Sequence, residues 1–240
     1  MSSTQQQGGL EVCEVVAHFH HQPFTYSLQV APGECVGVVG PSGGGKSTLL
    51  AMIAGFVTPE SGDIRVDGRS IVSLGPTQRP VTQVFQDHNL FAHLTLAQNV
   101  GLGLSPALRL DKDQWLRVEE ALHKVGLGEM GQRLPGTLSG GQRSRAALAR
   151  ALLRERSVLL LDEPLAALGP AQRREMLSAI ERLMDELALS VVLVSHQPDE
   201  LAPLCKRIAF VAEGRIASIG SYEALVSAEA PPVVRDYLGN

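Results

Sequence analysis

The stretch Gly40-Pro41-Ser42-Gly43-Gly44-Gly45-Lys46-Ser47-Thr48 decides the fold of this chain. It has the spacing G-x-x-x-x-G-K-[ST] and lies between apolar runs at 36–39 and 49–54. A strand, a glycine-rich loop and a helix in this order form a cradle whose backbone N–H groups bind phosphate oxygens. Lys46 would reach the β- and γ-phosphates, and the Ser47 hydroxyl would ligate Mg²⁺. The stretch predicts a nucleotide phosphate site in an α/β domain, in preference to a glycine-rich turn with a stray lysine.

The composition excludes several other classes of protein. With 240 residues, 44% of them hydrophobic and 19% charged, the chain suits a globular domain with a full core. The formal net charge of −4 gives no reason to expect a nucleic-acid partner. No run approaches about 18 apolar residues, and the polar stretch 1–9 lacks the pattern of a secretion signal. We therefore expect neither a membrane span nor export.

Cysteine and histidine side chains are the other candidate chemical groups. Cys13, Cys35 and Cys205 are far apart and have no C-x-x-C spacing, which predicts free, reduced thiols. The cluster His18-Phe19-His20-His21 has no second group of metal ligands elsewhere, so it favours a solvated loop over a metal site. Phe19 has two open interpretations, because an aromatic here can stack on a purine ring or pack as a core or edge-strand residue.

Strand-like runs lie on both sides of the phosphate loop. Segments 10–16 and 24–30 precede it, and 64–66 follows it and ends at a turn. We expect the segment up to Gln83 to form a small antiparallel sheet arm. Gln86 lies where the next apolar run becomes a loop, the position at which α/β folds carry ligands.

The middle of the chain is predicted to be helical. From Leu96 to about Leu134 apolar residues recur at three- and four-residue steps. Leu138-Ser139-Gly140-Gly141-Gln142 then opens a helix that runs to about Arg154, with Ser139 as its cap. Its amino terminus is a second anion cradle, which points to a phosphorylated ligand. We interpret the four arginines on this helix as a solvated basic face: Arg143, Arg145, Arg150 and Arg154.

Two further apolar strands end in polar side chains. Val158–Leu161 precedes Asp162 and Glu163, and a run at 191–194 precedes His196. At such strand ends Asp162 could hold Mg²⁺, Glu163 could accept a proton from an attacking water, and His196 could contact the γ-phosphate. The remaining predicted elements are a hairpin at 208–219 and a short terminal helix broken by Pro231-Pro232.

Taken in order, these motifs resemble the ATP-binding subunits of ABC transporters over about residues 10 to 225. The most specific of them is Leu-Ser-Gly-Gly-Gln at 138–142, between the phosphate loop and the acids at 162–163. The resemblance implies an α/β fold with a RecA-like P-loop ATPase core, an antiparallel β arm and a helical subdomain. Within a single domain over 1–240, the core would take 1–85 and 156–240, and the helical or signature subdomain 86–155.

The resemblance also implies a role for each motif residue. ATP would be bound by Phe19, stacked on adenine, by Gly40–Thr48 and, across a dimer interface, by Ser139, Gly140, Gly141 and Gln142. Mg²⁺ would be bound by Ser47, Gln86 and Asp162. The catalytic residues would be Lys46, Gln86, the general base Glu163 and the switch histidine His196.

Partners and location follow from the same resemblance. Two copies would pair head to tail as a homodimer on integral membrane permease subunits, whose coupling helix would enter a groove around 87–95. A periplasmic substrate-binding protein would act through the permease, and no nucleic acid would be bound. The chain would sit peripherally on the cytoplasmic face of the inner membrane. The stretch Phe85–Leu104 and the short chain resemble importers of a small nutrient, while a different solute, an exporter or a nucleotide-gated non-transport protein remain alternatives.

The chain departs from the family pattern at one position. Where the family has Ser-Ala-Leu-Asp after the acidic strand end, this chain has Ala166-Ala167-Leu168-Gly169. That aspartate works across the dimer interface. We therefore expect ATP hydrolysis that persists but is weaker or less cooperative.

Overall fold

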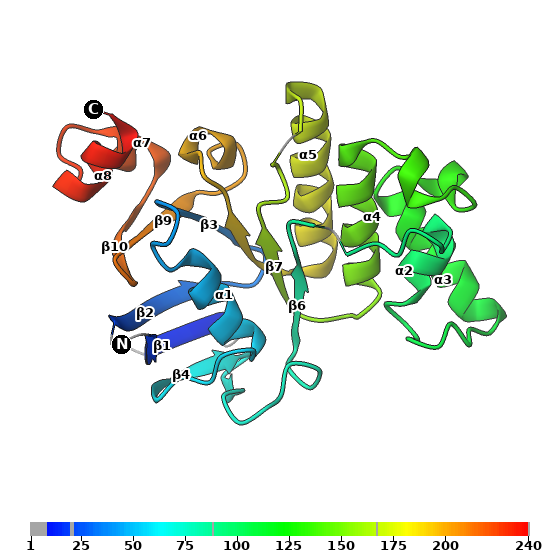
Figure 1. The fold of residues 1–240 in the computed structure, drawn as a ribbon, viewed down its shortest axis with the longest axis horizontal. Coiled ribbons are helices and arrows are strands. Elements are labelled where there is room, and N and C mark those ends of the chain that lie inside the picture. Colours follow the sequence, from blue (N-terminus) through cyan, green and yellow to red (C-terminus); the bar gives the residue numbers. More distant parts are fainter. Residues whose placement is uncertain (1–8, 20–21, 88, 167, 240) are drawn as a thin grey trace, which may run out of the picture.

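The computed structural model describes residues 9–19, 22–87, 89–166 and 168–239 (Figure 1). In these ranges a ten-stranded mixed sheet has the order β5-β4-β1-β2-β10-β9-β3-β8-β7-β6. The strands are β1 Leu10–Phe19, β2 Gln22–Val30, β3 Cys35–Val39, β4 Ser61–Val66, β5 Arg69–Ser70, β6 Val81–Val84, β7 Val158–Asp162, β8 Ser190–Val194, β9 Arg207–Ala212 and β10 Arg215–Gly220. The helices are α1 Lys46–Ala54, α2 Leu96–Gly101, α3 Lys112–Lys124, α4 Gly140–Leu152, α5 Pro170–Leu187, α6 Pro198–Leu201, α7 Tyr222–Val226 and α8 Pro232–Leu238, with 3₁₀ turns at Gly128–Met130 and Pro135–Thr137.

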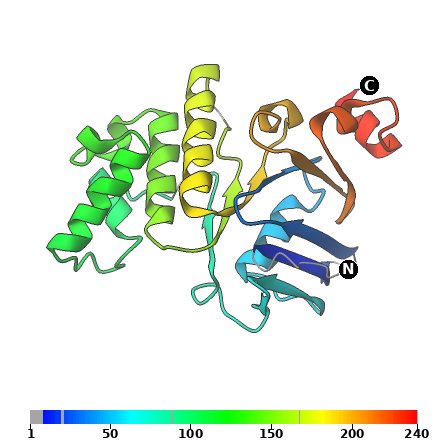
Figure 2. The same ribbon diagram turned by 180° about the vertical axis from the view of Figure 1, so that it is seen from behind.

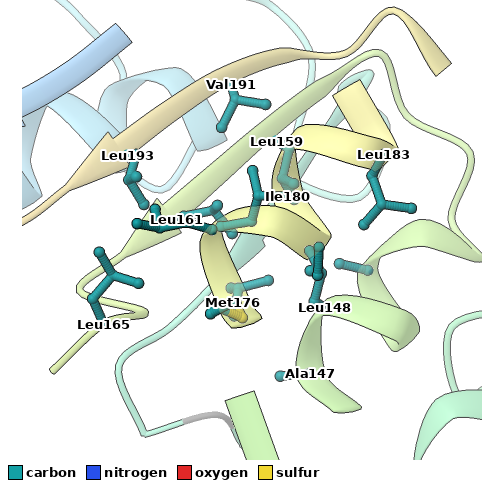
Figure 3. Close-up of a cluster of buried hydrophobic side chains, with 14 of the residues drawn as sticks. Ala147, Leu148, Leu159, Leu161, Leu165, Met176, Ile180, Leu183, Val191 and Leu193 are labelled. Atoms are coloured by element: carbon teal, nitrogen blue, oxygen red, sulfur yellow. The ribbon is translucent and has the colours of Figure 1, made fainter. Parts of the chain in front are cut away.

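The parallel half of the sheet consists of β9, β3, β8, β7 and β6. Its strands are buried on both faces, and alternate residues belong to two different hydrophobic clusters because successive side chains point to opposite faces. Val158 and Leu160 pack with α1. Leu159 and Leu161 pack with α5 and α4, in the cluster drawn in Figure 3. The α/β fold is thus confirmed, with strand ends that converge beside the phosphate loop.

The antiparallel arm is built from β1, β2, β4 and β5. Strand β10 connects it to the parallel half: Thr25 of β2 lies opposite Arg215 of β10, and β10 pairs antiparallel with β9. The predicted end of the arm at Gln83 is wrong, because β6 pairs in parallel with β7 and completes the buried half instead. A four-residue strand with the sequence Val-Thr-Gln-Val does not reveal its pairing partner, so the sequence pattern alone could not separate β6 from the antiparallel arm.

Helices α2, α3 and α4 lie beyond β6, drawn in green in Figure 1. The predicted helical run from Leu96 is two helices, since Asp111 caps a new one by accepting from the backbone N–H of Gln114 at 2.8 Å. Ser139 caps α4 as predicted and accepts from the N–H of Gln142. The subdomain boundaries 86–155 stay a prediction, because α4 shares one hydrophobic cluster with α5 and β7.

Two helical features differ from the sequence-based expectation. Helix α5 was not predicted, although Met176, Ile180 and Leu183 repeat at helical spacing and are buried. The prolines near the end do not break a helix; Pro232 begins α8, because a proline in the first turn lacks only an N–H that would have no partner there. Figure 2 shows α7 and α8 beside the β9–β10 hairpin, with the carboxyl end of the chain close by.

Three other expectations need comment. His18 and Phe19 belong to β1 and not to a loop, while His20 and His21 lie outside the described residues. The three thiols are free as predicted, yet Cys35 and Cys205 are not far apart: their Sγ atoms lie 3.2 Å from each other in the core. In the described part of the chain, no helix combines the length and the apolar character needed to cross a membrane.

Candidate functional site

The phosphate loop leaves the carboxyl end of β3 and passes directly into α1. Gly40, Gly43 and Gly45 have φ values of 145°, 76° and 110°, which disfavour side chains. A Cβ on Gly40 would lie 1.9 Å from the carbonyl oxygen of Val211, so the loop can approach β9 only with glycine there. The backbone is therefore shaped before any ligand arrives.

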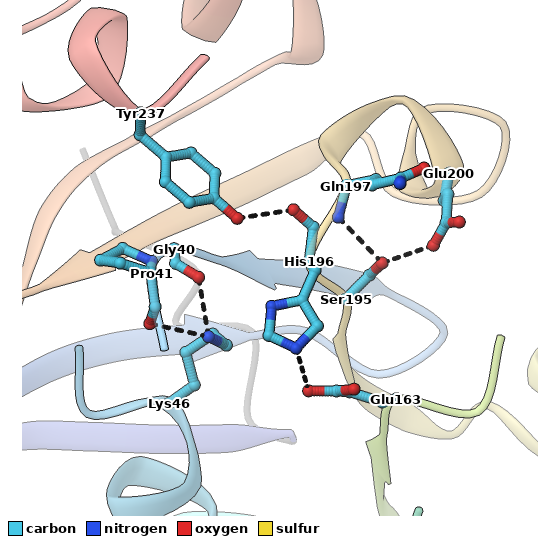
Figure 4. A network of polar contacts seen from close by, with 9 residues as sticks. All are labelled: Gly40, Pro41, Lys46, Glu163, Ser195, His196, Gln197, Glu200 and Tyr237. Carbon is cyan, nitrogen blue, oxygen red and sulfur yellow. Dashed lines mark hydrogen bonds and ion pairs between the residues drawn. The ribbon is translucent and has the colours of Figure 1, made fainter. Parts of the chain in front are cut away.

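Lys46 is buried under this loop. Its Nζ donates to the carbonyl oxygens of Gly40 at 2.7 Å and Pro41 at 3.0 Å (Figure 4). Burial lowers the pKa of the ammonium group, and the negative charges of Glu163 and Asp162 act in the opposite direction. The ammonium group is held in the loop with both carboxylates nearby, a position from which it can neutralise phosphate charge.

Tyr26 is a supporting residue that the motif analysis missed. It reaches from β2 and donates its hydroxyl to the carbonyl oxygen of Gly45 at 2.7 Å. Burial raises the pKa of this phenol, which therefore keeps its proton and remains a donor. A Cβ on Gly45 would lie 2.3 Å from the hydroxyl oxygen. Only the inward alternation of β2 marks Tyr26 in the sequence, and alternation does not reveal a hydrogen bond.

The two acids follow β7, and the histidine follows β8. Asp162 is the last residue of β7, and burial, followed by the charge of Glu163, raises the pKa of its carboxyl group. Glu163 has a left-handed φ of 51° and a side chain that is 16% exposed. Its Oε1 lies 2.6 Å from Nε2 of His196 (Figure 4). The ends of β3, β7 and β8 thus bring together Lys46, Asp162, Glu163 and His196.

A polar network continues from the histidine to α5. The Ser195 hydroxyl donates to Glu200 at 2.6 Å and accepts from the backbone N–H of Gln197 at 3.2 Å. The other carboxylate oxygen of Glu200 lies 2.9 Å from Nη2 of Arg173 on α5. A cavity of about 230 Å³ lies among these side chains and is lined also by Glu163 and His196. Sequence reasoning missed the network, because no motif connects Arg173 of α5 with the residues that follow β8.

The other predicted site residues lie at the edges of this constellation or outside it. Gln86 is exposed two residues after β6. Phe19 ends β1 with 38% of its surface exposed and one edge against Phe24, with ring centroids 5.4 Å apart. Ser139 and Gln142 start α4 and complete each other's capping box.

The predicted solvated basic face on α4 is wrong for three of its arginines. Arg143 donates to the carbonyl oxygen of Leu138 at 2.7 Å, and Arg145 pairs with Glu175 on α5 at 3.2 Å. Arg150 donates to the carbonyl oxygen of Asn89 at 2.7 Å, and burial lowers the pKa of its guanidinium. These side chains attach α4 to its surroundings because their long stems pack while their heads find carbonyl or carboxylate partners.

Comparison with known proteins places these features in one family. The sequence profile described as ABC transporter matches residues 24–166. The chain is 52% identical to the thiamine import ATP-binding protein ThiQ of Cereibacter sphaeroides, over 86% of this chain and 89% of that protein. It is 46% identical to ThiQ of Escherichia coli K12, over 92% and 95% of the two chains.

The fold has a close counterpart as well. The crystal structure of an ATP-binding cassette of an ABC transporter, in its ADP conformation, matches with a TM-score of 0.88 at 22% identity. That likeness covers 97% of this chain and 99% of the other. At this identity the likeness shows the fold, and the sequence matches show the family. The chain belongs to the ABC transporter family, as one of its ATP-binding, ATP-hydrolysing chains.

Proposed function

We propose that this chain hydrolyses ATP to drive the import of thiamine through a permease in the inner membrane. The observation that carries the hydrolytic part is the contact of Glu163 with His196, beside Lys46 and Asp162. The cargo is supported by 46–52% identity to thiamine import ATP-binding proteins over most of the chain. The stretch Phe85–Leu104 by itself also resembles those importers. No residue of this chain would touch the cargo, so another small solute is the alternative.

The candidate catalytic side chains divide the work among them. Lys46 and the backbone N–H groups of the phosphate loop would hold the β- and γ-phosphates of ATP and neutralise their charge. Glu163 would accept the proton of the attacking water and orient it, and His196 would bind the γ-phosphate from the other side. Gln86 would approach the same phosphate from the loop after β6, and Phe19 would stack its exposed face on adenine.

Mg²⁺ fits the donors that the site offers. Hard cations prefer oxygen ligands, and Asp162, Ser47 and Gln86 offer a carboxylate, a hydroxyl and an amide oxygen. Burial and the neighbouring Glu163 raise the pKa of Asp162, and a cation bound between these donors would offset the negative charge of both carboxylates. The bound ion would neutralise phosphate charge. Asp162 and Ser47 would hold it in place.

A second copy of the chain would complete each nucleotide site. Helix α4 begins with Gly140 and Gly141, whose backbone N–H groups are not used by side chains of the capping box, and Ser139 is exposed at the cap. Such a helix end binds an anion. We infer a head-to-tail homodimer in which Ser139–Gln142 of one copy faces the phosphate loop of the other.

A groove beside β6 is the proposed seat of the permease. It has a volume of about 720 Å³, and its aromatic lining residues include Phe56, Phe85 and Phe91, of which Phe56 and Phe91 are 60% and 50% exposed. Exposed aromatics of this kind mark protein interfaces. A coupling helix seated here would keep the chain at the cytoplasmic face of the membrane, and a periplasmic binding protein would act through the permease.

The decisive experiment measures ATP hydrolysis by the transporter reconstituted with its permease and periplasmic binding protein, with and without thiamine. We expect thiamine to raise the rate severalfold, since cargo delivery should favour closure of the ATP-bound dimer. An equal concentration of an unrelated vitamin is the control and should have no effect. If the rate of ATP hydrolysis does not depend on thiamine, the proposed ATPase activity stands and the proposed cargo is wrong. If nucleotide binds but no phosphate is released, a nucleotide-gated regulator is favoured.

Gly169 supports a second expectation. It is the N-cap of α5, with φ −68° and ψ 163°, and a Cβ built on it has no neighbour within 4 Å in the described residues; Ala167 lies outside them. Gly169→Asp should therefore fit, cap α5 and stabilise the fold by about a few tenths of a kcal/mol. We also expect it to raise the rate or the cooperativity of ATP hydrolysis.

Gly169→Ala is the matched variant, because it fills the position without supplying a carboxylate. A steady-state ATPase titration and a thermal melt of both variants would separate capping from catalysis. Equal rates for the aspartate and alanine variants would mean that the missing carboxylate does not matter in this chain.

A further inference from the structure

The peptide unit between His196 and Gln197 is held at both of its polar ends. Its carbonyl oxygen, on His196, accepts a hydrogen bond from the Tyr237 hydroxyl at 2.7 Å. Its N–H, on Gln197, donates to the Ser195 hydroxyl oxygen at 3.2 Å. Figure 4 shows the tyrosine arriving from one side and the Ser195–Glu200 pair from the other, with the imidazole between them and Glu163. The backbone that carries the histidine is therefore fixed by side chains outside the motifs.

Tyr237 is itself well placed to act as a rigid donor. It lies near the end of α8, and its ring packs edge-on against Phe210 of β9, with centroids 5.3 Å apart. Burial raises the pKa of the phenol, and the charge of Glu163 adds to the effect, so the hydroxyl stays protonated. Val234, one turn earlier, is fully buried and anchors the helix. The Tyr237 hydroxyl is thus held in position by the packing of α8.

The histidine side chain needs such support because packing alone does not hold it. Its side chain is 47% exposed, and its Nε2 lies 2.6 Å from Oε1 of Glu163. A side chain in this situation keeps a productive geometry only if its backbone and neighbours are fixed. The direction of the imidazole therefore depends on the His196–Gln197 peptide, and that peptide depends on Tyr237.

We propose that Tyr237 is a positioning residue for ATP hydrolysis: its hydroxyl sets the His196 peptide so that Nε2 meets Glu163. The proposal rests on the role of His196 proposed above. It makes the carboxyl-terminal helix a working part of the nucleotide site, although α8 contains none of the family motifs. Ser195, supported by Glu200, holds the opposite side of the same peptide.

The test compares Tyr237→Phe with Tyr222→Phe in the full-length chain. Each variant loses one phenol hydroxyl, from α8 in the first case and from the adjacent helix α7 in the second. The Tyr222 hydroxyl makes no hydrogen bond among the described residues. We expect Tyr237→Phe to lower kcat about fivefold, the value of one hydrogen bond, with KM for ATP unchanged within about twofold. Tyr222→Phe should leave both constants at the wild-type values.

Two further measurements separate positioning from simple destabilisation. In a His196→Ala background Tyr237→Phe should lower kcat no further, because the two changes act through one side chain. The second measurement needs no turnover: the imidazole resonances of His196 should shift or broaden in Tyr237→Phe and stay unchanged in Tyr222→Phe.

The outcomes distinguish this proposal from the one on which it rests. A His196→Ala variant with wild-type kcat would overturn the proposed role of the histidine. The role of Tyr237 alone would be overturned by a different result: His196→Ala is slow, but Tyr237→Phe and Tyr222→Phe have equal rates and unchanged imidazole resonances.

Discussion

Replacement of Glu163 by glutamine is expected to lower the kcat of ATP hydrolysis by at least about a hundredfold while ATP still binds, since general-base catalysis contributes roughly that much or more. Glutamine keeps the shape of the side chain and an oxygen that can face Nε2 of His196, now 2.6 Å from the carboxylate. An amide cannot accept the proton of the attacking water. In the proposed mechanism ATP binding depends on Lys46 and the phosphate loop, which the substitution leaves in place.

Phosphate release and the binding of a fluorescent ATP analogue should be measured side by side. Glu213→Gln is the matched control, because Glu213 is an exposed carboxylate in the β9–β10 turn with only a loose ion pair. It should hydrolyse ATP at the wild-type rate. A Glu163→Gln variant that keeps more than about a tenth of that rate would show that another group orients the water.

Replacement of Arg79 by methionine is expected to reduce the free energy of unfolding by about 3 to 5 kcal/mol. The arginine is 1% exposed, and its guanidinium donates to the carbonyl oxygens of Leu74, Met52, Ile53 and Val72. Two of these acceptors belong to the last turn of α1, the helix that follows the phosphate loop. Methionine would fill the space and leave all of these buried oxygens without their charged donor.

The end of α1 packs closely against this arginine. Gly55 ends α1 with a φ of 88°, and a Cβ there would lie 2.6 Å from Nε of Arg79. Denaturant unfolding of Arg79→Met should be compared with that of Arg65→Met, which removes only an exposed ion pair and should change stability little. Equal midpoints for the two variants would mean that the buried guanidinium contributes little to stability.

Local patterns predicted the parts of the fold that depend on neighbours in sequence. The phosphate loop, the Ser139 cap and the acids at the end of β7 are all marked by residue types at fixed spacing, and the structure has each of them. Patterns of this kind could not predict partners from distant segments. The parallel pairing of β6, the Tyr26 hydroxyl under Gly45 and the contact between Cys35 and Cys205 all join residues that no motif connects.

The missed prediction of helix α5 has a different cause. Its apolar residues have helical spacing, and a proline starts it, so its sequence does carry the signal of a helix. The site residues follow the same division. Those proposed to face the nucleotide lie in motifs, whereas Arg173, Glu200 and Tyr237, which hold the histidine backbone and its neighbours, had to be found in three dimensions.

The position of β3 in the sheet has a consequence for folding of the chain during its synthesis on the ribosome. This strand carries the phosphate loop, yet its two neighbours are β8 and β9, which are synthesised more than a hundred residues later. Gly40 rests against Val211, near the end of β9. Pairings between distant segments form late, because the intervening chain must first be made and closed into a loop. The nascent chain therefore exposes a finished nucleotide motif without a nucleotide site, and ATP can assist folding only once residues beyond about 211 have left the exit tunnel.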